Sequence, residues 1–167
     1  MDWEQALSGG VDLSKVEVGQ RWLSDGRTML EHELGLACML STDWHPIHAD
    51  AAYAAASTVG QRVFQGGYGV LLALGMATRF PAVGNRQALA LGLQDWHFRL
   101  PLFVGDTVRA GVEITQKRPT SDGQRLVLEK HILLFKHSGE ICQEGRAASL
   151  ITLSAEAGDP LMSGQTP

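Results

Sequence analysis

One stretch of the sequence limits the choice of fold more than any other. Residues 66–80 contain the run Val70-Leu71-Leu72-Ala73-Leu74-Gly75-Met76, which is apolar nearly all the way around a helix. A helix at a protein surface carries one apolar stripe, so a helix of this kind has to be wrapped by other parts of the structure. The run is also far short of the roughly 20 residues that cross a bilayer. The chain therefore needs a curved layer around one central helix, which Pro81 is expected to end.

The second half of the chain can supply that layer. Four segments are rich in Val, Ile, Leu and Phe with stretches of alternation, which is typical of β-strands: residues 88–98, 107–117, 126–136 and 141–153. Turn-forming residues separate them, at Gly105-Asp106, Ser121-Asp122-Gly123 and Ser138-Gly139. Strands joined by such short links pair antiparallel. A helix followed by these strands predicts an α+β fold with a curved antiparallel sheet.

The length and the ends of the chain predict a single domain. A chain of 167 residues suits one domain, since domains cluster near about 100–150 residues. Both ends show little periodicity, so we expect an N-terminal arm over residues 1–17, a folded domain over 18–153 and a flexible C-terminal tail over 154–167.

Charge and cysteine content argue against several classes of protein. The chain has 14 Lys and Arg against 18 Asp and Glu, a net charge of −4 that is spread along the sequence, so neither nucleic acid nor a membrane is an expected partner. The start of the chain lacks the basic and apolar regions of a secretory signal. Cys38 and Cys142 are too few for a disulfide scaffold and are expected to be reduced thiols. These features predict a cytoplasmic protein.

The densest group of reactive side chains is Asp43-Trp44-His45-Pro46-Ile47-His48-Ala49-Asp50, in which Pro46 prevents a regular helix through the whole segment. Three interpretations stay open. In the first, this is a solvated loop before an Ala-rich helix over residues 50–58, with Asp50 as its N-cap. In the second, Asp43, His45, His48 and Asp50 bind a metal ion, although their spacing fits none of the common metal motifs. In the third, Asp43 and His48 form an acid/base pair that needs no metal.

The same residues carry a resemblance to a known family. The pattern Asp43-x-x-Pro46-Ile47-His48-x-Asp50-x-x-Tyr53-Ala54, followed by Gly60 and Gly66, resembles the MaoC-like (R)-specific enoyl-CoA hydratases and β-hydroxyacyl-thioester dehydratases. The resemblance continues in Phe98-Arg99-x-Pro101-x-x-x-Gly105-Asp106-Thr107 and in Gly139-Glu140…Gly145-x-Ala147, and it covers roughly residues 18–153. It implies the hotdog fold, in which a curved antiparallel sheet wraps a long central helix. The layout expected from the sequence pattern agrees with this fold.

The resemblance also implies an activity. The reaction is reversible addition of water to a trans-2-enoyl thioester, which gives an (R)-3-hydroxyacyl thioester. The protein would then be a hydro-lyase that acts on an acyl-CoA or acyl-carrier thioester and needs no cofactor. By position, Asp43 and His48 would share the acid and base tasks around one bound water. A backbone N–H at the start of the central helix, from Gly66 or Gly67, would stabilise the thioester oxygen. Because the family forms dimers through its sheet edges, a homodimer is expected.

The sequence departs from the commonest family pattern near these residues. His45 stands where Asn is usual, Gln65 stands where His often precedes the first helix glycine, and Val59 stands where Phe is frequent. His45 and Gln65, together with Tyr53 and Tyr68, are the candidates for lining the substrate pocket. The changes keep the catalytic pair but leave the acyl group open.

Three other functions remain open. A thioesterase can use the same fold, and it would release free CoA thiol. A metal-dependent hydrolase using Asp43, His45 and His48 would lose its activity with a chelator. A non-catalytic thioester-binding module would bind acyl-CoA without turnover, and His45 at the usual Asn position favours this last alternative.

Overall fold

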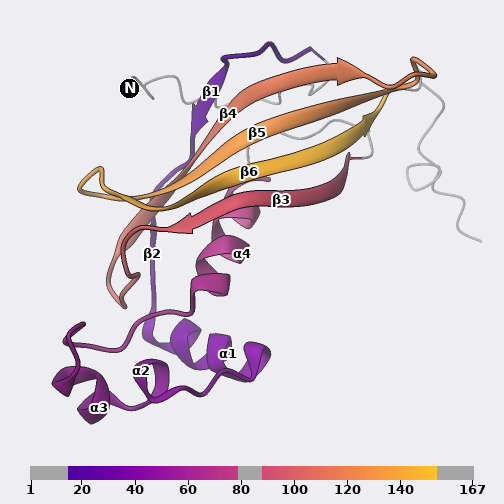
Figure 1. Ribbon diagram of the computed structural model, residues 1–167. Coiled ribbons are helices and arrows are strands. Elements are labelled where there is room, and N and C mark those ends of the chain that lie inside the picture. The colour runs from indigo at the N-terminus through magenta and orange to yellow at the C-terminus, as the bar shows by residue number, and fades with distance from the viewer. Residues whose placement is uncertain (1–14, 79–87, 154–167) are drawn as a thin grey trace, which may run out of the picture.

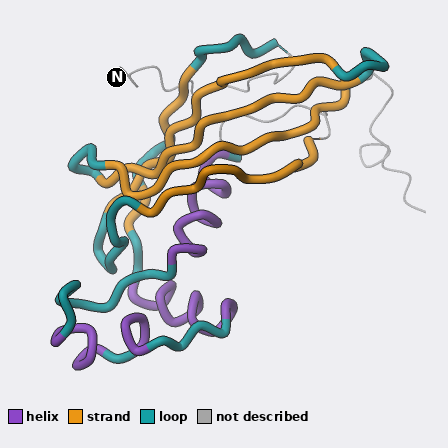
Figure 2. Tube along the Cα trace, in the orientation of Figure 1, coloured by secondary structure: helices purple, strands orange, loops and turns teal. Residues whose placement is uncertain are grey.

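The computed structural model describes residues 15–78 and 88–153, and it confirms the α+β layout. A curved sheet lies over helix α4 (Gly66–Ala77), and three shorter helices form a group at the far end of α4 (Figures 1 and 2). This is the arrangement that the hotdog resemblance implies. Most of the predicted arm, the whole predicted tail and the expected helix end at Pro81 lie outside the described residues.

The sheet is antiparallel throughout. Its long strands are β3 (Ala88–Phe98), β4 (Thr107–Pro119), β5 (Arg125–Lys136) and β6 (Ile141–Thr152), each within two residues of the predicted bounds. The strand order is β1-β4-β5-β6-β3, where β1 is Arg21–Leu23, and the short strand β2 (Arg27–Thr28) also pairs with β4. The sequence analysis does not predict β1 and β2, because two or three residues are too few to show a strand period.

The predicted turns lie where the strands reverse. Gly123 has φ +68° between β4 and β5, and Gly139 has φ +91° between β5 and β6. Residues with a Cβ atom rarely adopt such angles, so glycine allows both hairpins to close within a few residues.

The core lies between α4 and the inner face of the sheet. Alternating residues of β4 and β5 point inward, are almost completely buried and meet the buried side of α4. The residues are Val108, Ala110, Val112 and Ile114 on β4, Leu126, Leu128, Ile132 and Leu134 on β5, and Leu72, Ala73 and Met76 on α4. Removing this apolar surface from water is the main favourable contribution to folding.

The sheet that wraps α4 leaves one side of this helix exposed, although the apolar sequence of the helix predicts cover by other parts of the structure. Gly67, Leu71 and Gly75 are exposed along one side of the helix, and 63% of Leu71 is accessible. The reason is geometric, because one sheet curves around only one side of the helix. The edge strand β3 lies open as well, with four large apolar side chains exposed: Leu89, Leu91, Leu93 and Phe98.

Three helices precede α4 in the chain: α1 (Glu31–Ser41), α2 (Pro46–Ala49) and α3 (Ala51–Ala56). The sequence analysis does not predict α1. As predicted, no single helix runs through the reactive segment, but a short helical turn does begin at Pro46, whose missing N–H is harmless at a first helical position. Asp50 caps α3 by accepting from the N–H groups of Ala52 and Tyr53, as predicted. Within residues 15–78 and 88–153, every helix lacks the length or the apolar character for a bilayer crossing.

A buried carboxylate ties α1 to its neighbours. Glu33 is 5% exposed and accepts from the Leu30 N–H, the Tyr68 O–H and the Arg27 guanidinium. Burial alone would raise the pKa of Glu33, but these bonds outweigh burial and hold that pKa below its ordinary value. The ionised carboxylate therefore stabilises the contact between α1, β2 and α4.

We expect Glu33→Gln to lower the free energy of unfolding by about 1–3 kcal/mol at neutral pH. A carboxyl whose folded pKa is depressed stabilises the protein above its unfolded pKa and loses that effect as the pH falls through the folded pKa. Urea unfolding at about pH 7 and about pH 3 should therefore show a difference between the two proteins that shrinks in acid. The control is Glu31→Gln, which removes an exposed carboxylate of the same helix and should change stability by less than about 0.5 kcal/mol. An equal effect of Glu33→Gln at both pH values would contradict this account.

Candidate active site

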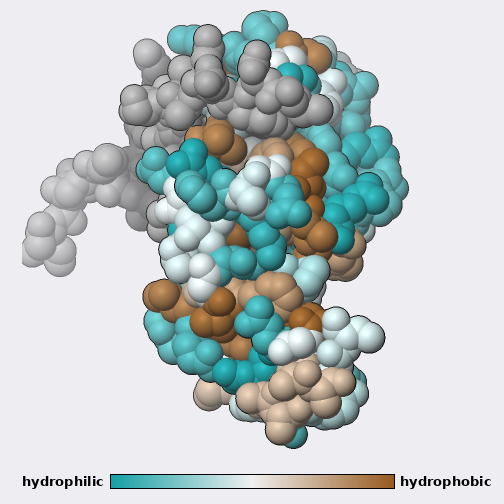
Figure 3. Space-filling view, turned by 90° about the vertical axis from the view of Figure 1, so that its left-hand side faces the viewer, coloured by the Kyte–Doolittle hydropathy of each residue, from teal (hydrophilic) through white to brown (hydrophobic). Residues whose placement is uncertain are grey.

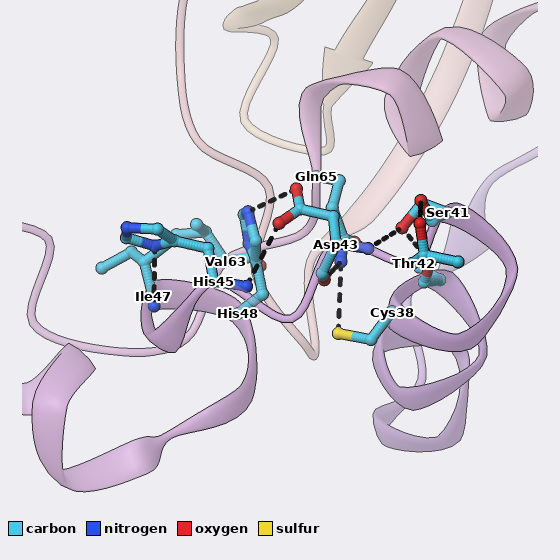
Figure 4. A network of polar contacts seen from close by, with 10 residues as sticks. Cys38, Ser41, Thr42, Asp43, His45, Ile47, His48, Val63 and Gln65 are labelled. Atoms are coloured by element: carbon cyan, nitrogen blue, oxygen red, sulfur yellow. Dashed lines mark hydrogen bonds and ion pairs between the residues drawn. The ribbon is translucent and has the colours of Figure 1, made fainter.

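The carboxylate of Asp43 is held by the chain on both sides of it. Helix α1 ends at Ser41, and Thr42 follows with φ +59° and turns the chain back. The Asp43 N–H donates to Ser41 Oγ at 3.2 Å, and Asp43 Oδ1 accepts from the His45 N–H at 3.1 Å. These local bonds fix one carboxylate oxygen, while Oδ2 faces His48 (Figure 4).

His48 lies on the short helix α2 and is mostly buried, with 12% of its side chain accessible. Its Nδ1 is 2.7 Å from the carbonyl oxygen of Val63. A carbonyl oxygen only accepts, so Nδ1 carries a proton, and in the neutral form of the ring Nε2 is the atom with a free lone pair. The carbonyl is itself held in place, since Val63 donates its N–H to Ile47 and pairs with Phe103.

The structure brings the two predicted catalytic side chains together. His48 Nε2 lies 3.4 Å from Asp43 Oδ2. With the proton on Nδ1, both facing atoms are hydrogen-bond acceptors, so a neutral His48 and an ionised Asp43 cannot bond to each other directly. The pair can instead accept both hydrogen atoms of one water molecule.

His45 does not share this arrangement. Its Nδ1 accepts from the Ile47 N–H at 3.2 Å and thereby caps α2. Its ring lies edge-on to those of Tyr53 and His48, with centroids 6.1 and 6.3 Å away. Tyr53 is half exposed. The imidazole at the usual Asn position thus acts as a helix cap, and neither His45 nor Tyr53 lines the cavity beside Asp43.

That cavity has a volume of about 380 Å³ and lies between the end of α1 and the start of α4. Its walls are mainly apolar, with Asp43 and two of the predicted pocket residues among them: Ala37, Leu40, Ser41, Asp43, Gln65, Gly67, Tyr68 and Leu71. Figure 3 shows hydrophobic residues gathered at the waist where the helical group meets the sheet. The arrangement suits a ligand with an apolar part and one reactive end.

Two wall residues are held by buried polar contacts. Gln65 is 6% exposed, and its Nε2 donates to the Asp43 carbonyl and to Cys38 Sγ, both at 3.2 Å (Figure 4). Burial and the nearby Glu33 raise the pKa of the Tyr68 phenol, which stays protonated and donates to that carboxylate at 2.9 Å. Gln65 therefore joins Asp43 to the start of α4, and the bond to Glu33 ties the cavity residue Tyr68 to α1.

The two glycines at the start of α4 have different surroundings. A Cβ atom at Gly66 would lie 2.8 Å from the Phe98 ring, so this glycine allows close packing. Gly67 has open space where its Cβ would be, and it lines the cavity. Among the described residues, no acceptor is found for the N–H of either glycine. Gly67 is thus the glycine whose backbone meets the cavity.

Sequence reasoning missed the part of the site that α1 contributes, Ala37, Leu40 and Ser41. The apolar spacing of Leu34, Ala37 and Cys38 at i, i+3 and i+4 could have revealed this helix. The backbone carbonyl of Val63, which fixes the His48 tautomer, leaves no signal in a sequence. Within the described ranges, no three His, Cys, Asp or Glu side chains converge as metal ligands would.

Comparisons with known proteins show which sequences and folds this chain is similar to. The (R)-specific enoyl-CoA hydratase of Aeromonas caviae is 36% identical over 116 residues, which are 69% of this chain and 81% of the relative. The structure of the (R)-hydratase PhaJ1 of Pseudomonas aeruginosa is 27% identical, has a TM-score of 0.70 and covers 90% of this chain and 93% of its own.

Other matches are partial or show the fold alone. Two further curated relatives are about twice as long as this chain, and the matched residues span 33% and 32% of their lengths. A Mycobacterium tuberculosis protein with a double hotdog fold has a TM-score of 0.73 at 17% identity, covering 90% of this chain and 47% of its own. The family model described as the MaoC-like domain matches residues 15–132. The chain therefore belongs to the MaoC-like dehydratase family and has its hotdog fold.

Proposed function

We propose that this protein catalyses the reversible hydration of a trans-2-enoyl thioester, with Asp43 and His48 as its acid/base pair. The observation that carries the proposal is the 3.4 Å approach of His48 Nε2 to Asp43 Oδ2, with the proton of the ring directed to Val63. Two acceptors at this spacing hold one water by both of its hydrogen atoms. The oxygen lone pairs of that water then point away from the pair, toward a bound substrate.

The chemistry follows from that water. One member of the pair takes a proton from the water while the oxygen bonds to C3 of the enoyl group, and the electrons of the double bond move onto the thioester oxygen. C2 then receives a proton from the pair, which completes the addition. The reverse sequence removes water from the (R)-3-hydroxyacyl thioester. Because each proton removed is returned, the reaction needs no cofactor.

The start of α4 is suited to the charge that develops on the thioester oxygen. The N–H groups of Gly66 and Gly67 lie at the positive end of the helix dipole, and Gly67 meets the cavity. The apolar wall residues Ala37, Leu40 and Leu71 would contact the acyl chain. The substrate is thus an acyl thioester carried by CoA or by an acyl carrier.

Removal of either catalytic side chain should lower turnover by about 10²- to 10⁴-fold. The variants are Asp43→Asn, which keeps the shape but weakens the acceptor, and His48→Ala. The measurement is the loss of enoyl absorbance with short and medium trans-2-enoyl-CoA. His32→Gln, which changes an exposed histidine on α1, should keep the wild-type rate. Near-wild-type turnover by both site variants would remove the pair from the mechanism.

The same assay separates the rival functions. A thioesterase releases a thiol that a thiol reagent detects, whereas hydration releases none. A metal-dependent hydrolase loses activity with a chelator and regains it with Zn²⁺, whereas the proposed reaction is insensitive to chelator. Binding of acyl-CoA without loss of absorbance would point to a non-catalytic module.

We also propose that the protein acts as a homodimer. An 11-residue strand with exposed apolar side chains at a sheet edge invites pairing with another strand. Pairing of β3 with β3 of a second copy would continue the sheet and cover part of this edge. Under twofold symmetry, each contact of residue i with residue j of the partner is matched by the reverse contact, so both copies use the same patch.

The Leu91→Glu variant should weaken this dimer, because it places a charge on the exposed apolar edge of each copy, and charged side chains on an edge strand oppose its pairing. Light scattering after size-exclusion chromatography should give the mass of a dimer for the wild-type protein at micromolar concentration. The variant should give a mass closer to that of a monomer. Val18→Glu is the matched control, since Val18 is similarly exposed but lies beside β1 at the other edge. A monomeric wild-type protein would contradict the proposal.

A further inference from the structure

A buried glutamine on β6 contacts the start of α4. Gln143 is 3% exposed and belongs to the sheet face that packs against α4. Its Nε2 donates to the carbonyl oxygen of Gly66 at 3.2 Å, and its Oε1 accepts from Trp96 Nε1 at 3.1 Å. The amide thus connects the neighbouring strand β3 to the first turn of α4.

The contact between Gln143 and α4 is possible because helix position 69 is a glycine. A Cβ atom at Gly69 would lie 2.1 Å from Gln143 Nε2 and 2.6 Å from its Cδ. Any other residue at position 69 would push the amide away from the helix. The close approach of Gln143 to α4 therefore depends on a glycine that the reactive motif does not include.

The carbonyl group that Gln143 bonds is directly joined to the N–H of Gly67. The C=O of Gly66 and the N–H of Gly67 belong to the same planar peptide group, so whatever orients one orients the other. A hydrogen bond accepted by the carbonyl also polarises the peptide and makes its N–H a stronger donor. Gly67 lines the cavity beside Asp43, and its N–H has no acceptor among the described residues.

We propose that Gln143 is a positioning residue for the reaction. It acts through the Gly66–Gly67 peptide, holding the Gly67 N–H toward the thioester oxygen and strengthening it as a donor. This inference rests on the proposed hydration of an enoyl thioester. It adds a strand, β6, to a site that otherwise comes from helices α1, α2 and α4 and the loops beside them.

The test is the Gln143→Met variant, which keeps the length of the side chain but removes both hydrogen bonds. Complete loss of one oxyanion donor costs about 10²- to 10³-fold in kcat. Misorientation of a donor that remains should cost less, about 10-fold in kcat, with KM changed by less than about 2-fold.

A spectroscopic readout separates this role from a merely structural one. Butyryl-CoA has the thioester carbonyl but no double bond, so it binds without reacting. Its infrared carbonyl band should move to lower frequency on binding the wild-type protein and should move less on binding Gln143→Met. A contribution to stability alone would lower Tm and leave that band unchanged.

A second variant reaches the same contact without changing the glutamine. Gly69→Ala should displace the Gln143 amide and produce the same loss of kcat and the same smaller band shift. Gly35→Ala is the control, because this helical glycine on α1 has open space where its Cβ would be. If Gln143→Met does not fold, Gly69→Ala still decides the question.

The outcomes are distinct for the two proposals. If the wild-type protein turns over an enoyl thioester and both variants keep its kcat and its carbonyl band shift, the role of Gln143 is overturned and the hydratase proposal stands. Variants that have a lower Tm but an unchanged kcat and an unchanged carbonyl band also overturn the role of Gln143 and leave the hydratase proposal standing. No turnover of any enoyl thioester by the wild-type protein overturns both proposals.

Discussion

The structure depends on burying one apolar helix against one curved sheet. Helix α4 needs cover on most of its surface, and β4 and β5 provide it on one side. The sheet must curve to do this, and it leaves the line of Gly67, Leu71 and Gly75 open. The cavity forms at the N-terminal end of this open side, where α1 approaches α4. The site is thus a consequence of incomplete wrapping.

Two buried amides join the helices and the sheet around that cavity. Gln65 bonds the carbonyl of Asp43 and so links the candidate base to the start of α4. Gln143 bonds the carbonyl of Gly66 from the opposite side, from β6. Each amide donates to a backbone carbonyl and so helps to hold the backbone there in one geometry, while Gln65 Oε1 is itself buried with no hydrogen-bond partner among the described residues. Most of the polar contacts around the site orient backbone groups, which carry no side-chain signature.

Much of the fold was predictable because its signals are local. The four long strands and their glycine turns follow from alternation and from backbone freedom, which each segment shows by itself. The cap made by Asp50 is also local. Helix α1 was missed, and the open side of α4 was not foreseen, because wrapping depends on how far a sheet of given length can curve. His45 could not be assigned as the cap of α2 before the course of the backbone was known.

The sequence by itself determined the type of fold and the long strands. It also determined Asp43 and His48 as a candidate pair, since residues this close in the chain come near each other in space where a turn begins at Pro46. Only the tertiary structure decided the state of that pair. The proton of His48 is fixed by the carbonyl of Val63, 15 residues away in sequence. Likewise, the contacts of Gly66 come from Phe98 on β3 and from Gln143 on β6, strands that follow it by more than 30 and more than 70 residues in the chain. Hydrogen-bond geometry between distant segments exists only after folding, and this is why residue type and spacing could name the groups but not their protonation or orientation.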